Sequence, residues 1–163
     1  MQELKEPVPN RDHWGTPPRE FHIICSMWGL VPTMDVCASK ENTRCIYFID
    51  EQMDAFKTEW EAYNGVCWMN PPYSQPLMTR FIERAIDQSG KHGIAVVFLL
   101  PDNIDHEWYD LIMPFPHKVW RDPEQKKGRK THRIEFIPPA GVKPSSARNG
   151  NIHGVIDVWG RFV

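Results

Sequence analysis

No uninterrupted apolar run in this chain of 163 residues approaches the ~18 residues that a membrane-spanning helix needs. The opening stretch, MQELKEPVPNRDHW, also lacks the apolar core of a secretory signal peptide. We therefore expect no membrane association and a cytoplasmic protein. Hydrophobic residues make up 41% and charged residues 25% of the chain, which excludes a disordered protein and fits one globular domain.

Cysteine is scarce, and its spacing matches neither a zinc site nor a disulfide framework. The four cysteines lie 12, 8 and 22 residues apart, with no CxxC pair. Each lies in an apolar stretch, so buried free thiols are expected. The seven histidines show no metal-ligand spacing, and we expect no bound metal.

Neither sign of charge dominates, because 19 Lys and Arg face 21 Asp and Glu for a net charge of −2. This balance excludes a polycation that coats nucleic acid through bulk charge. Residues 118–133 nevertheless carry seven basic and two acidic side chains, a local net charge of +5. Such a basic segment on an acidic body indicates contact with a polyanion at one edge, with a solvated surface loop as the alternative.

Strand-like and helix-like periodicities alternate along most of the chain. The first helix is expected to have Thr16 as its N-cap and Pro17 as its first residue, and to end at Gly29. The other expected helices cover residues 53–62, 76–88 (stopped by Gly90) and 105–113. The expected strands cover residues 31–37, 45–49, 66–69 and 94–100, followed by β-like pieces at 118–120, 133–137 and 155–159.

This alternation predicts an α/β domain with a mostly parallel central sheet and helices on both faces. The last strands have connections too short for a crossover helix, so an antiparallel C-terminal edge is expected. The domain would cover residues 14–163 after a loose N-terminal arm at 1–13. Ligands of such open sheets bind beyond the carboxyl ends of the strands, near the point where the strand order reverses.

Two expected strand ends stand out by their chemistry. Residues 35–39, with the sequence DVCAS, follow the first strand, and Asn70-Pro71-Pro72-Tyr73 follows the third. The two prolines fix the backbone and remove two N–H groups, so the Asn70 side-chain oxygen and the Pro71 carbonyl can accept from one NH₂ group. Tyr73 offers a flat ring to stack on the planar group that bears this amine. The alternative is a proline-rich turn with a space-filling tyrosine.

With these motifs in order, the chain resembles the phage-type DNA N6-adenine methyltransferase (Dam) family, which uses S-adenosylmethionine. The resemblance runs from Trp14 to about Phe136 and is looser beyond. The matching pieces are Trp14-Gly15-Thr16-Pro17-Pro18, Asp35-Val36-Cys37-Ala38-Ser39 with Glu41-Asn42, Tyr47-Phe48, Trp60, Trp68-Met69-Asn70-Pro71-Pro72-Tyr73, Leu99-Leu100-Pro101, Asp105 with Trp108, and Arg133-Ile134-Glu135-Phe136.

The resemblance implies a single-domain Rossmann-like methyltransferase fold and a set of residues around S-adenosylmethionine. Asp50 or Glu51 would bind the ribose and Asp54 the adenine, although Asp50 and Glu51 also suit the start of a helix. A glycine-rich loop is missing after the first strand, where Ala38 and Ser39 take its place. The residues expected at the cofactor are Trp14, Thr16, Pro17, Asp35, Cys37, Ala38, Ser39, Asp50, Asp54 and Asn70.

The activity that the resemblance implies is methyl transfer to the N6 amine of an adenine flipped out of double-stranded DNA, in a prokaryote or a virus-infected host cell. The catalytic residues would be Asn70, Pro71, Pro72 and Tyr73. The phosphate contacts would be Lys127, Arg129, Lys130 and Arg133, and His106 and Trp108 are expected in the cleft.

Two other interpretations of the sequence stay open. Motifs like that of residues 70–73 also occur in enzymes that methylate RNA bases or protein glutamine, whose amide presents the same planar NH₂. The chain could also be a catalytically silent DNA-binding module. Binding of S-adenosylmethionine separates this last interpretation from the enzymes.

Overall fold

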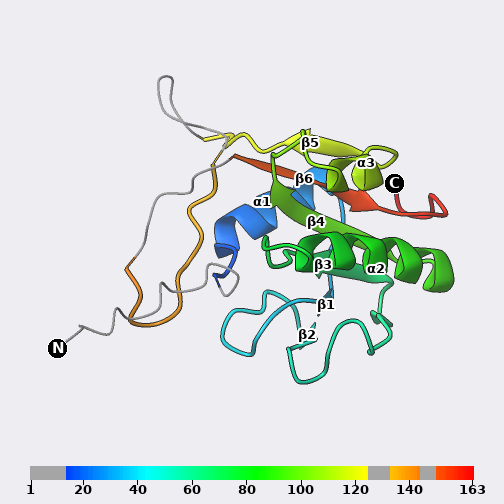
Figure 1. Ribbon diagram of the computed structural model, residues 1–163, viewed down its shortest axis with the longest axis horizontal. Coiled ribbons are helices and arrows are strands. Elements are labelled where there is room, and N and C mark those ends of the chain that lie inside the picture. Colours follow the sequence, from blue (N-terminus) through cyan, green and yellow to red (C-terminus); the bar gives the residue numbers. More distant parts are fainter. Residues whose placement is uncertain (1–13, 125–132, 144–149) are drawn as a thin grey trace.

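The computed structural model describes residues 14–124, 133–143 and 150–163 (Figure 1). Its elements, in chain order, are α1 (Pro18–Trp28), β1 (Met34–Asp35), β2 (Tyr47–Phe48), β3 (Val66–Met69), α2 (Leu77–His92), β4 (Ala95–Pro101), α3 (Trp108–Ile112), β5 (His117–Val119) and β6 (Asn151–Ile156).

Six strands form one sheet in the order β2-β1-β3-β4-β6-β5. The pairs β1–β2, β1–β3 and β3–β4 are parallel, whereas β6 pairs antiparallel with both β4 and β5. The prediction of a mostly parallel sheet with an antiparallel C-terminal part is therefore confirmed. The last strand is not the outermost one, because β6 lies between β4 and β5.

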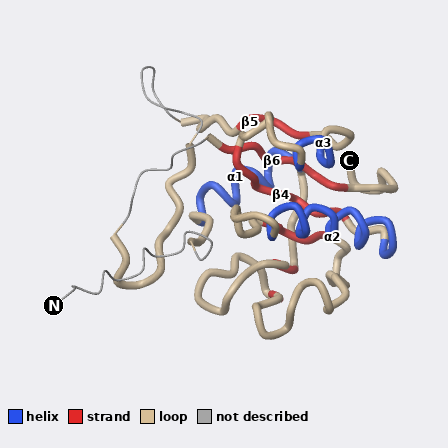
Figure 2. Tube along the Cα trace, in the orientation of Figure 1, coloured by secondary structure: helices blue, strands red, loops and turns tan. Residues whose placement is uncertain are grey.

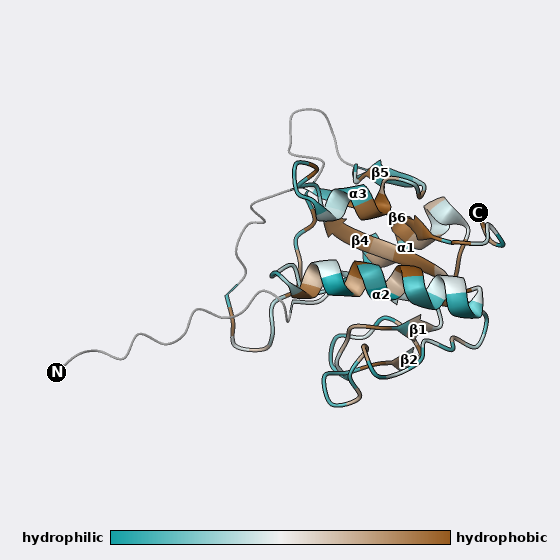
Figure 3. Cartoon of the chain, turned by 45° about the vertical axis from the view of Figure 1, so that its right-hand side comes forward, coloured by the Kyte–Doolittle hydropathy of each residue, from teal (hydrophilic) through white to brown (hydrophobic). Residues whose placement is uncertain are grey.

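Helices cover both faces of the sheet, as predicted (Figures 1 and 2). Alternate residues of β4 explain why its sequence is continuously apolar: Val97 and Leu99 share one core with α1, and Val96 and Phe98 share the other with α2 and α3. A strand buried on both faces needs apolar side chains at every position. In Figure 3, β4 is accordingly brown along its length, while α2 shows both brown and teal residues.

The ends of the two long helices partly match the predictions. Gly29 ends α1 in the left-handed conformation (φ 66°), as expected. For α2, the end is not Gly90 but Gly93 (φ 65°), so Gly90 lies inside the helix. Thr16 is not the N-cap of α1, because Pro17 occupies that position and no side chain caps the helix.

The helix expected over residues 53–62 is absent. Asp54 adopts a positive φ of 58°, which breaks a right-handed helix, and its side chain accepts a hydrogen bond from the Phe56 N–H at 2.9 Å. Phe56 and Trp60 still face the core as the spacing indicated, but from an irregular loop.

Three of the seven expected strands are shortened or lost, whereas β3, β4 and β5 lie within one residue of their expected bounds. The last strand, β6, covers Asn151–Ile156 instead of the expected 155–159. The strands β1 and β2 have two residues each, where seven and five were expected. The piece at 133–137 forms no strand and keeps a single bridge between Ile137 and Gly15. The helix expected at 105–113 is reduced to the single turn of α3.

Gly154 lies in β6 between Phe98 of β4 and His117 of β5. A β-carbon here would overlap the Pro116 carbonyl oxygen, the Phe98 ring and the His117 β-carbon. We therefore expect Gly154→Ala to lower the free energy of unfolding by about 1–3 kcal/mol, measured by urea denaturation.

Gly90→Ala is the matched control for this substitution. A β-carbon at position 90 would meet only Val158 Cγ1, at an ordinary 3.9 Å. Because alanine favours a helix interior, this variant should be more stable by about 0.5–1 kcal/mol. Equal effects of the two substitutions would contradict the packing described for β6.

Candidate active site

The two predicted strand ends meet at the point where the strand order reverses. From β1 the chain leads to β2 on one side of it and then returns to β3 on the other. Asp35, the last residue of β1, is in register with Trp68 of β3, and the Val36 N–H donates to the Trp68 carbonyl at 3.0 Å. The carboxyl ends of these parallel strands therefore place residues 35–39 beside residues 70–73, where open sheets bind their ligands.

Asn70 is joined to the segment that precedes α1. Its Nδ2 donates to the Thr16 hydroxyl at 2.9 Å, and the buried Thr16 in turn accepts from Arg44 Nε at its carbonyl, at 2.7 Å. These bonds fix the orientation of the Asn70 amide. Nothing among the described residues donates a hydrogen bond to Asn70 Oδ1, which makes this oxygen available as an acceptor.

Residues 14–16 are brought to the strand ends by an irregular segment of the C-terminal half. Gly15 and Ile137 exchange both backbone hydrogen bonds, each 2.8 Å long. A β-carbon at position 15 would lie 3.3 Å from Asn42 Cβ, so glycine permits the close approach of the loop after β1. Thr16, with its chain neighbours Trp14 and Pro17, thus lies in the same region as the two strand ends.

Asp35 carries the most perturbed carboxyl group of this region. It is only 4% exposed, and burial raises its pKa to about 7, although two backbone N–H groups and the Arg44 charge favour the ionised form. The donors are the N–H of Cys37, 3.2 Å from Oδ1, and the N–H of Arg44, 3.5 Å from Oδ2. The carboxylate can therefore exist here, but at an energetic cost.

The loop of Cys37, Ala38 and Ser39 differs physically from a glycine-rich loop. The Ala38 N–H donates to the Ile49 carbonyl at 3.1 Å, and the Ser39 N–H donates to Asn42 Oδ1 at 2.7 Å. Since the Cys37 N–H is taken by Asp35, all three backbone donors are satisfied within the protein. A ligand beside this loop meets side chains and carbonyl groups instead of free N–H groups.

Tyr73 is held at its hydroxyl end. The hydroxyl donates to the Leu99 carbonyl and accepts from Asn151 Nδ2, both at 3.3 Å, and burial raises its pKa. The ring also meets Phe136 edge to face, with centroids 6.2 Å apart. These contacts fix the direction of the Tyr73 ring, and Pro71 of the same motif is buried as well.

Asn151 is a residue of this region that sequence reasoning missed. It is 2% exposed, and its Nδ2 also donates to the Leu100 carbonyl, while its Oδ1 accepts from the Ile134 N–H, each at 3.3 Å. One side chain thus links Tyr73, the end of β4 and the segment that pairs with Gly15. Its partners are far away along the chain, so no local sequence signal marks it.

The loop after β2 holds the remaining expected cofactor residues. Asp50 Oδ1 accepts from the Met53 N–H at 2.9 Å, so this carboxylate closes a turn, as that of Asp54 does. The absence of a helix at 53–62 removes the explanation of Asp50 and Glu51 as helix N-terminal charges. Sequence reasoning also missed how this loop is held.

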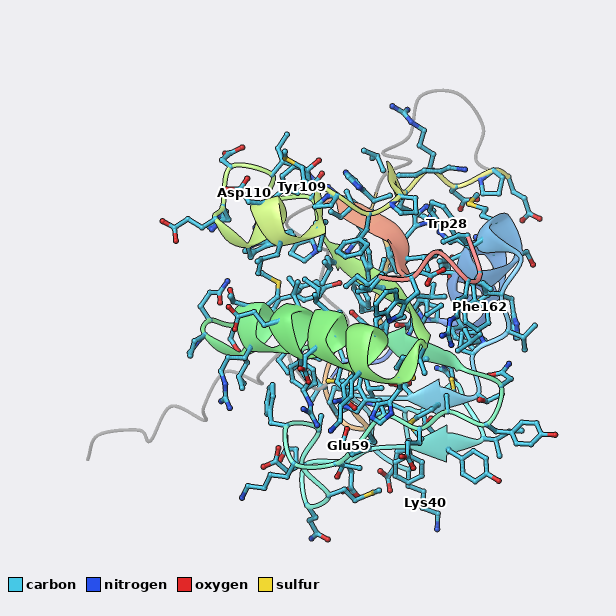
Figure 4. All side chains as sticks on the ribbon, turned by 90° about the vertical axis from the view of Figure 1, so that its right-hand side faces the viewer. Trp28, Lys40, Glu59, Tyr109, Asp110 and Phe162 are labelled. Carbon is cyan, nitrogen blue, oxygen red and sulfur yellow. The ribbon has the colours of Figure 1, made fainter. Side chains whose placement is uncertain are left out.

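The loop is fastened to α2 by polar side chains. Arg84 donates to the Ala55 and Thr58 carbonyls at 3.2 and 2.9 Å, and the buried Gln88 accepts from the Trp60 N–H at 2.7 Å. Glu59, labelled below α2 in Figure 4, accepts from Lys91 at 2.6 Å. Gln88 continues the apolar spacing of α2, which was the available signal that it faces inward.

Comparison with known proteins now identifies the family. The sequence profile of the DNA N-6-adenine-methyltransferase (Dam) family matches residues 3–161. The chain belongs to the Dam family. The match extends beyond both ends of the segment from Trp14 to about Phe136 that carries the resemblance.

Two curated Dam relatives come from phages. The DNA N-6-adenine-methyltransferase of Haemophilus phage HP1 is 36% identical over 102 residues, which cover 63% of this chain and 57% of that protein. The DNA N-6-adenine-methyltransferase of Escherichia phage T1 is 32% identical over 99 residues, covering 61% of this chain and 40% of that protein. The chain thus spans about half the length of these relatives. No solved structure matches it.

The basic segment of this Dam protein is described only in part. Lys127, Arg129 and Lys130 lie outside the described residues, whereas Arg133 is described and half-buried. Both acidic residues of the segment form ion pairs with Arg19, which donates to Asp122 at 2.7 Å and to Glu124 at 2.8 Å. The hydrogen bond from Arg19 lowers the pKa of Asp122.

The structure also places the residues expected in the cleft and the cysteines. Trp108 is not a cleft residue, because it is buried in the core against α2, and His106 is exposed. All four cysteines are free, but only Cys25 and Cys67 are buried. The described residues include no group suited to hold a metal ion, and none of their helices is long and apolar enough to cross a membrane.

The raised pKa of Asp35 predicts a pH-dependent stability. Unfolded, this carboxyl ionises near 3.8, but folded it keeps its proton up to about pH 7. The stability of the wild-type protein therefore falls as the pH rises between these values, by about 4 kcal/mol from this group. Asp35→Asn removes this contribution.

We expect the stability of Asp35→Asn relative to wild type to be about 2–3 kcal/mol more favourable at pH 8 than at pH 5. The measurement is urea denaturation of both proteins at the two pH values. Other titrating groups cancel in the comparison. A pH-independent difference would mean that Asp35 ionises normally in the folded chain.

Proposed function

We propose that this chain is a Rossmann-like, S-adenosylmethionine-dependent methyltransferase that methylates the exocyclic N6 amine of an adenine flipped out of double-stranded DNA. The observation that carries the proposal is the position of Asn70 and Pro71 at the strand-order reversal, with the Asn70 amide anchored through Thr16. Membership of the Dam family supports the substrate.

The residues around the strand ends have the chemistry that S-adenosylmethionine requires. Asp35 offers a buried carboxylate for the ammonium of the methionine part, and Trp14, Thr16, Pro17 and the loop of Cys37, Ala38 and Ser39 would surround the rest of it. Asp50 would bind the ribose and Asp54 the adenine. In each residue Oδ1 accepts the backbone N–H that closes a turn, so Oδ2 would contact the cofactor. When bound, the cofactor supplies a methyl group on a positively charged sulfur, which is already activated for transfer.

Asn70 and Pro71 would act on the accepting amine. The adenine N6 amine is a weak nucleophile because its lone pair is delocalised into the ring. Hydrogen bonds from its two hydrogens to Asn70 Oδ1 and the Pro71 carbonyl favour a pyramidal nitrogen and offset the positive charge that develops on it. Because Thr16 already holds the other end of the Asn70 amide, this acceptor is preorganised. After transfer, the positively charged amine would lose one proton to solvent, so no strong general base is required.

Tyr73 and the basic segment would serve binding of the DNA. A base flipped out of the duplex loses stacking and pairing worth a few kcal/mol, and a fixed aromatic ring can return about 1–3 kcal/mol of this. The hydroxyl contacts of Tyr73 hold such a ring in place. Lys127, Arg129, Lys130 and Arg133 would contact phosphates, with the local charge of +5 in residues 118–133 as support.

Transfer of label from S-adenosylmethionine tests the proposal. We expect methyl groups on adenine N6 when the protein is incubated with labelled cofactor and a mixture of DNA, RNA and protein, followed by nucleoside and amino-acid analysis. Label on RNA or on glutamine would assign the same site to a different acceptor. DNA binding without cofactor binding would identify a catalytically silent module.

Variants within residues 70–73 separate the two roles proposed there. Asn70→Ala removes a preorganised acceptor and should lower the rate of the chemical step by about 10²–10³-fold with little change in DNA affinity. Tyr73→Ala should cost about 1–3 kcal/mol in the flipped state, and less where the target adenine is mispaired. Single-turnover methylation of matched and mismatched duplexes measures both effects.

Tyr73→Phe is the matched control, because it keeps the ring and removes the hydroxyl bonds to Leu99 and Asn151. It should retain most of the activity that Tyr73→Ala loses. If a mismatch rescues Asn70→Ala and Tyr73→Ala equally, or rescues neither, the division of roles between these residues is wrong.

A further inference from the structure

Arg44 lies at the strand-order reversal with most of its donors unused. Its Nε donates to the Thr16 carbonyl at 2.7 Å, and one terminal nitrogen would lie 4.0 Å from a β-carbon at Gly15. Its two terminal nitrogens donate no hydrogen bond within the described part of the chain. A guanidinium group has five N–H donors in a planar fork, so four remain for a ligand.

The Arg44 guanidinium and the Asp35 carboxylate are neighbours that do not form an ion pair. The Arg44 charge favours ionisation of Asp35, but the contact between the two residues runs from the Arg44 backbone N–H, at 3.5 Å. A guanidinium and a carboxyl group that influence each other without forming a salt bridge match a ligand that carries one charge of each sign. An α-amino acid is such a ligand, with its ammonium and carboxylate two bonds apart.

The backbone N–H groups of the loop after β1 cannot bind the carboxylate of such a ligand. The N–H groups of Cys37, Ala38 and Ser39 are all engaged within the protein, whereas glycine-rich loops bind anions through free N–H groups. Arg44 lies five residues after Ser39, in the same connection between β1 and β2, and supplies a positive charge with a bidentate geometry. A DNA phosphate fits less well, because it carries no cationic group to pair with Asp35.

We infer that Arg44 binds the α-carboxylate of the methionine part of the cofactor, opposite Asp35, which takes the α-ammonium. This inference rests on the proposed function, since it concerns the same cofactor. It adds a residue that the sequence motifs did not mark, and it makes the amino-acid end of the cofactor a determinant of affinity.

Calorimetric titration with two cofactor fragments tests the inference. S-adenosylhomocysteine carries the amino-acid end, and 5′-methylthioadenosine lacks both its ammonium and its carboxylate. Arg44→Gln should weaken binding of S-adenosylhomocysteine by about 10–100-fold, as expected for loss of a hydrogen-bonded charge. Binding of 5′-methylthioadenosine should stay within about threefold of wild type.

Two controls make the comparison sharper. The decarboxylated analogue of S-adenosylhomocysteine keeps the ammonium, so wild type should bind it as weakly as Arg44→Gln binds the full ligand, with no further loss in the variant. Arg44→Lys keeps the positive charge and should retain part of the affinity. It also serves as the second variant if thermal melting shows that Arg44→Gln does not fold.

The possible failures are distinguishable. Equal weakening of both ligands by Arg44→Gln would show that Arg44 only supports Thr16, and unchanged affinity for S-adenosylhomocysteine would also overturn the inference. Weakened DNA binding with normal cofactor binding would assign Arg44 to phosphate. If wild-type protein binds neither nucleoside ligand, the proposed function fails together with the inference.

Discussion

The parallel pairing of β1 with β3 is the constraint on which the rest of the site depends. These strands contribute two and four residues to the sheet, yet their register fixes which side chains leave it together. Shifting the register by one residue would turn Asp35 to the opposite face of the sheet, away from its contacts with Cys37 and Arg44.

Polar side chains hold the loops that the short pairing of β1 with β3 does not fix. Arg84 and Arg44 each satisfy carbonyl groups of irregular segments that lie outside the strands and helices. A buried carbonyl without a partner costs about 1–3 kcal/mol, so each of these side chains stabilises a loop that would otherwise open to water. The irregular parts of the molecule are therefore also the parts that carry the residues proposed for function, on a sheet that positions them.

The sequence predicted those elements that local patterns determine. The strand at 66–69 and the end of α1 at Gly29 follow from an apolar run and from a single glycine. The meeting of residues 35–39 with residues 70–73 was also predictable, because carboxyl ends of parallel strands share an edge. The helix expected at 53–62 failed because Asp54 prefers to close a turn, a choice that periodicity does not reveal.

The features that could not be predicted from the sequence depend on contacts between residues far apart in the chain. Arg44 and Thr16 are 28 positions apart, and Asn151 and Tyr73 are 78 apart, so neither pair leaves a local pattern. The end of α2 at Gly93 instead of Gly90 is a related case. Both glycines can end a helix, and alone they do not indicate which one the surrounding packing selects.

Asp35 connects the stability of the fold with the proposed chemistry. An ionised carboxyl group in this buried position costs free energy, as its raised pKa indicates. A ligand ammonium beside it would replace the lost hydration, and a ligand carboxylate on Arg44 would balance the remaining charge. Binding of such a ligand then stabilises the folded chain as well as placing the methyl donor. The ionised form of Asp35, which is the form that binds an ammonium, is thus also the form that lowers the stability of the fold. Such a trade of stability for function is common at preorganised sites.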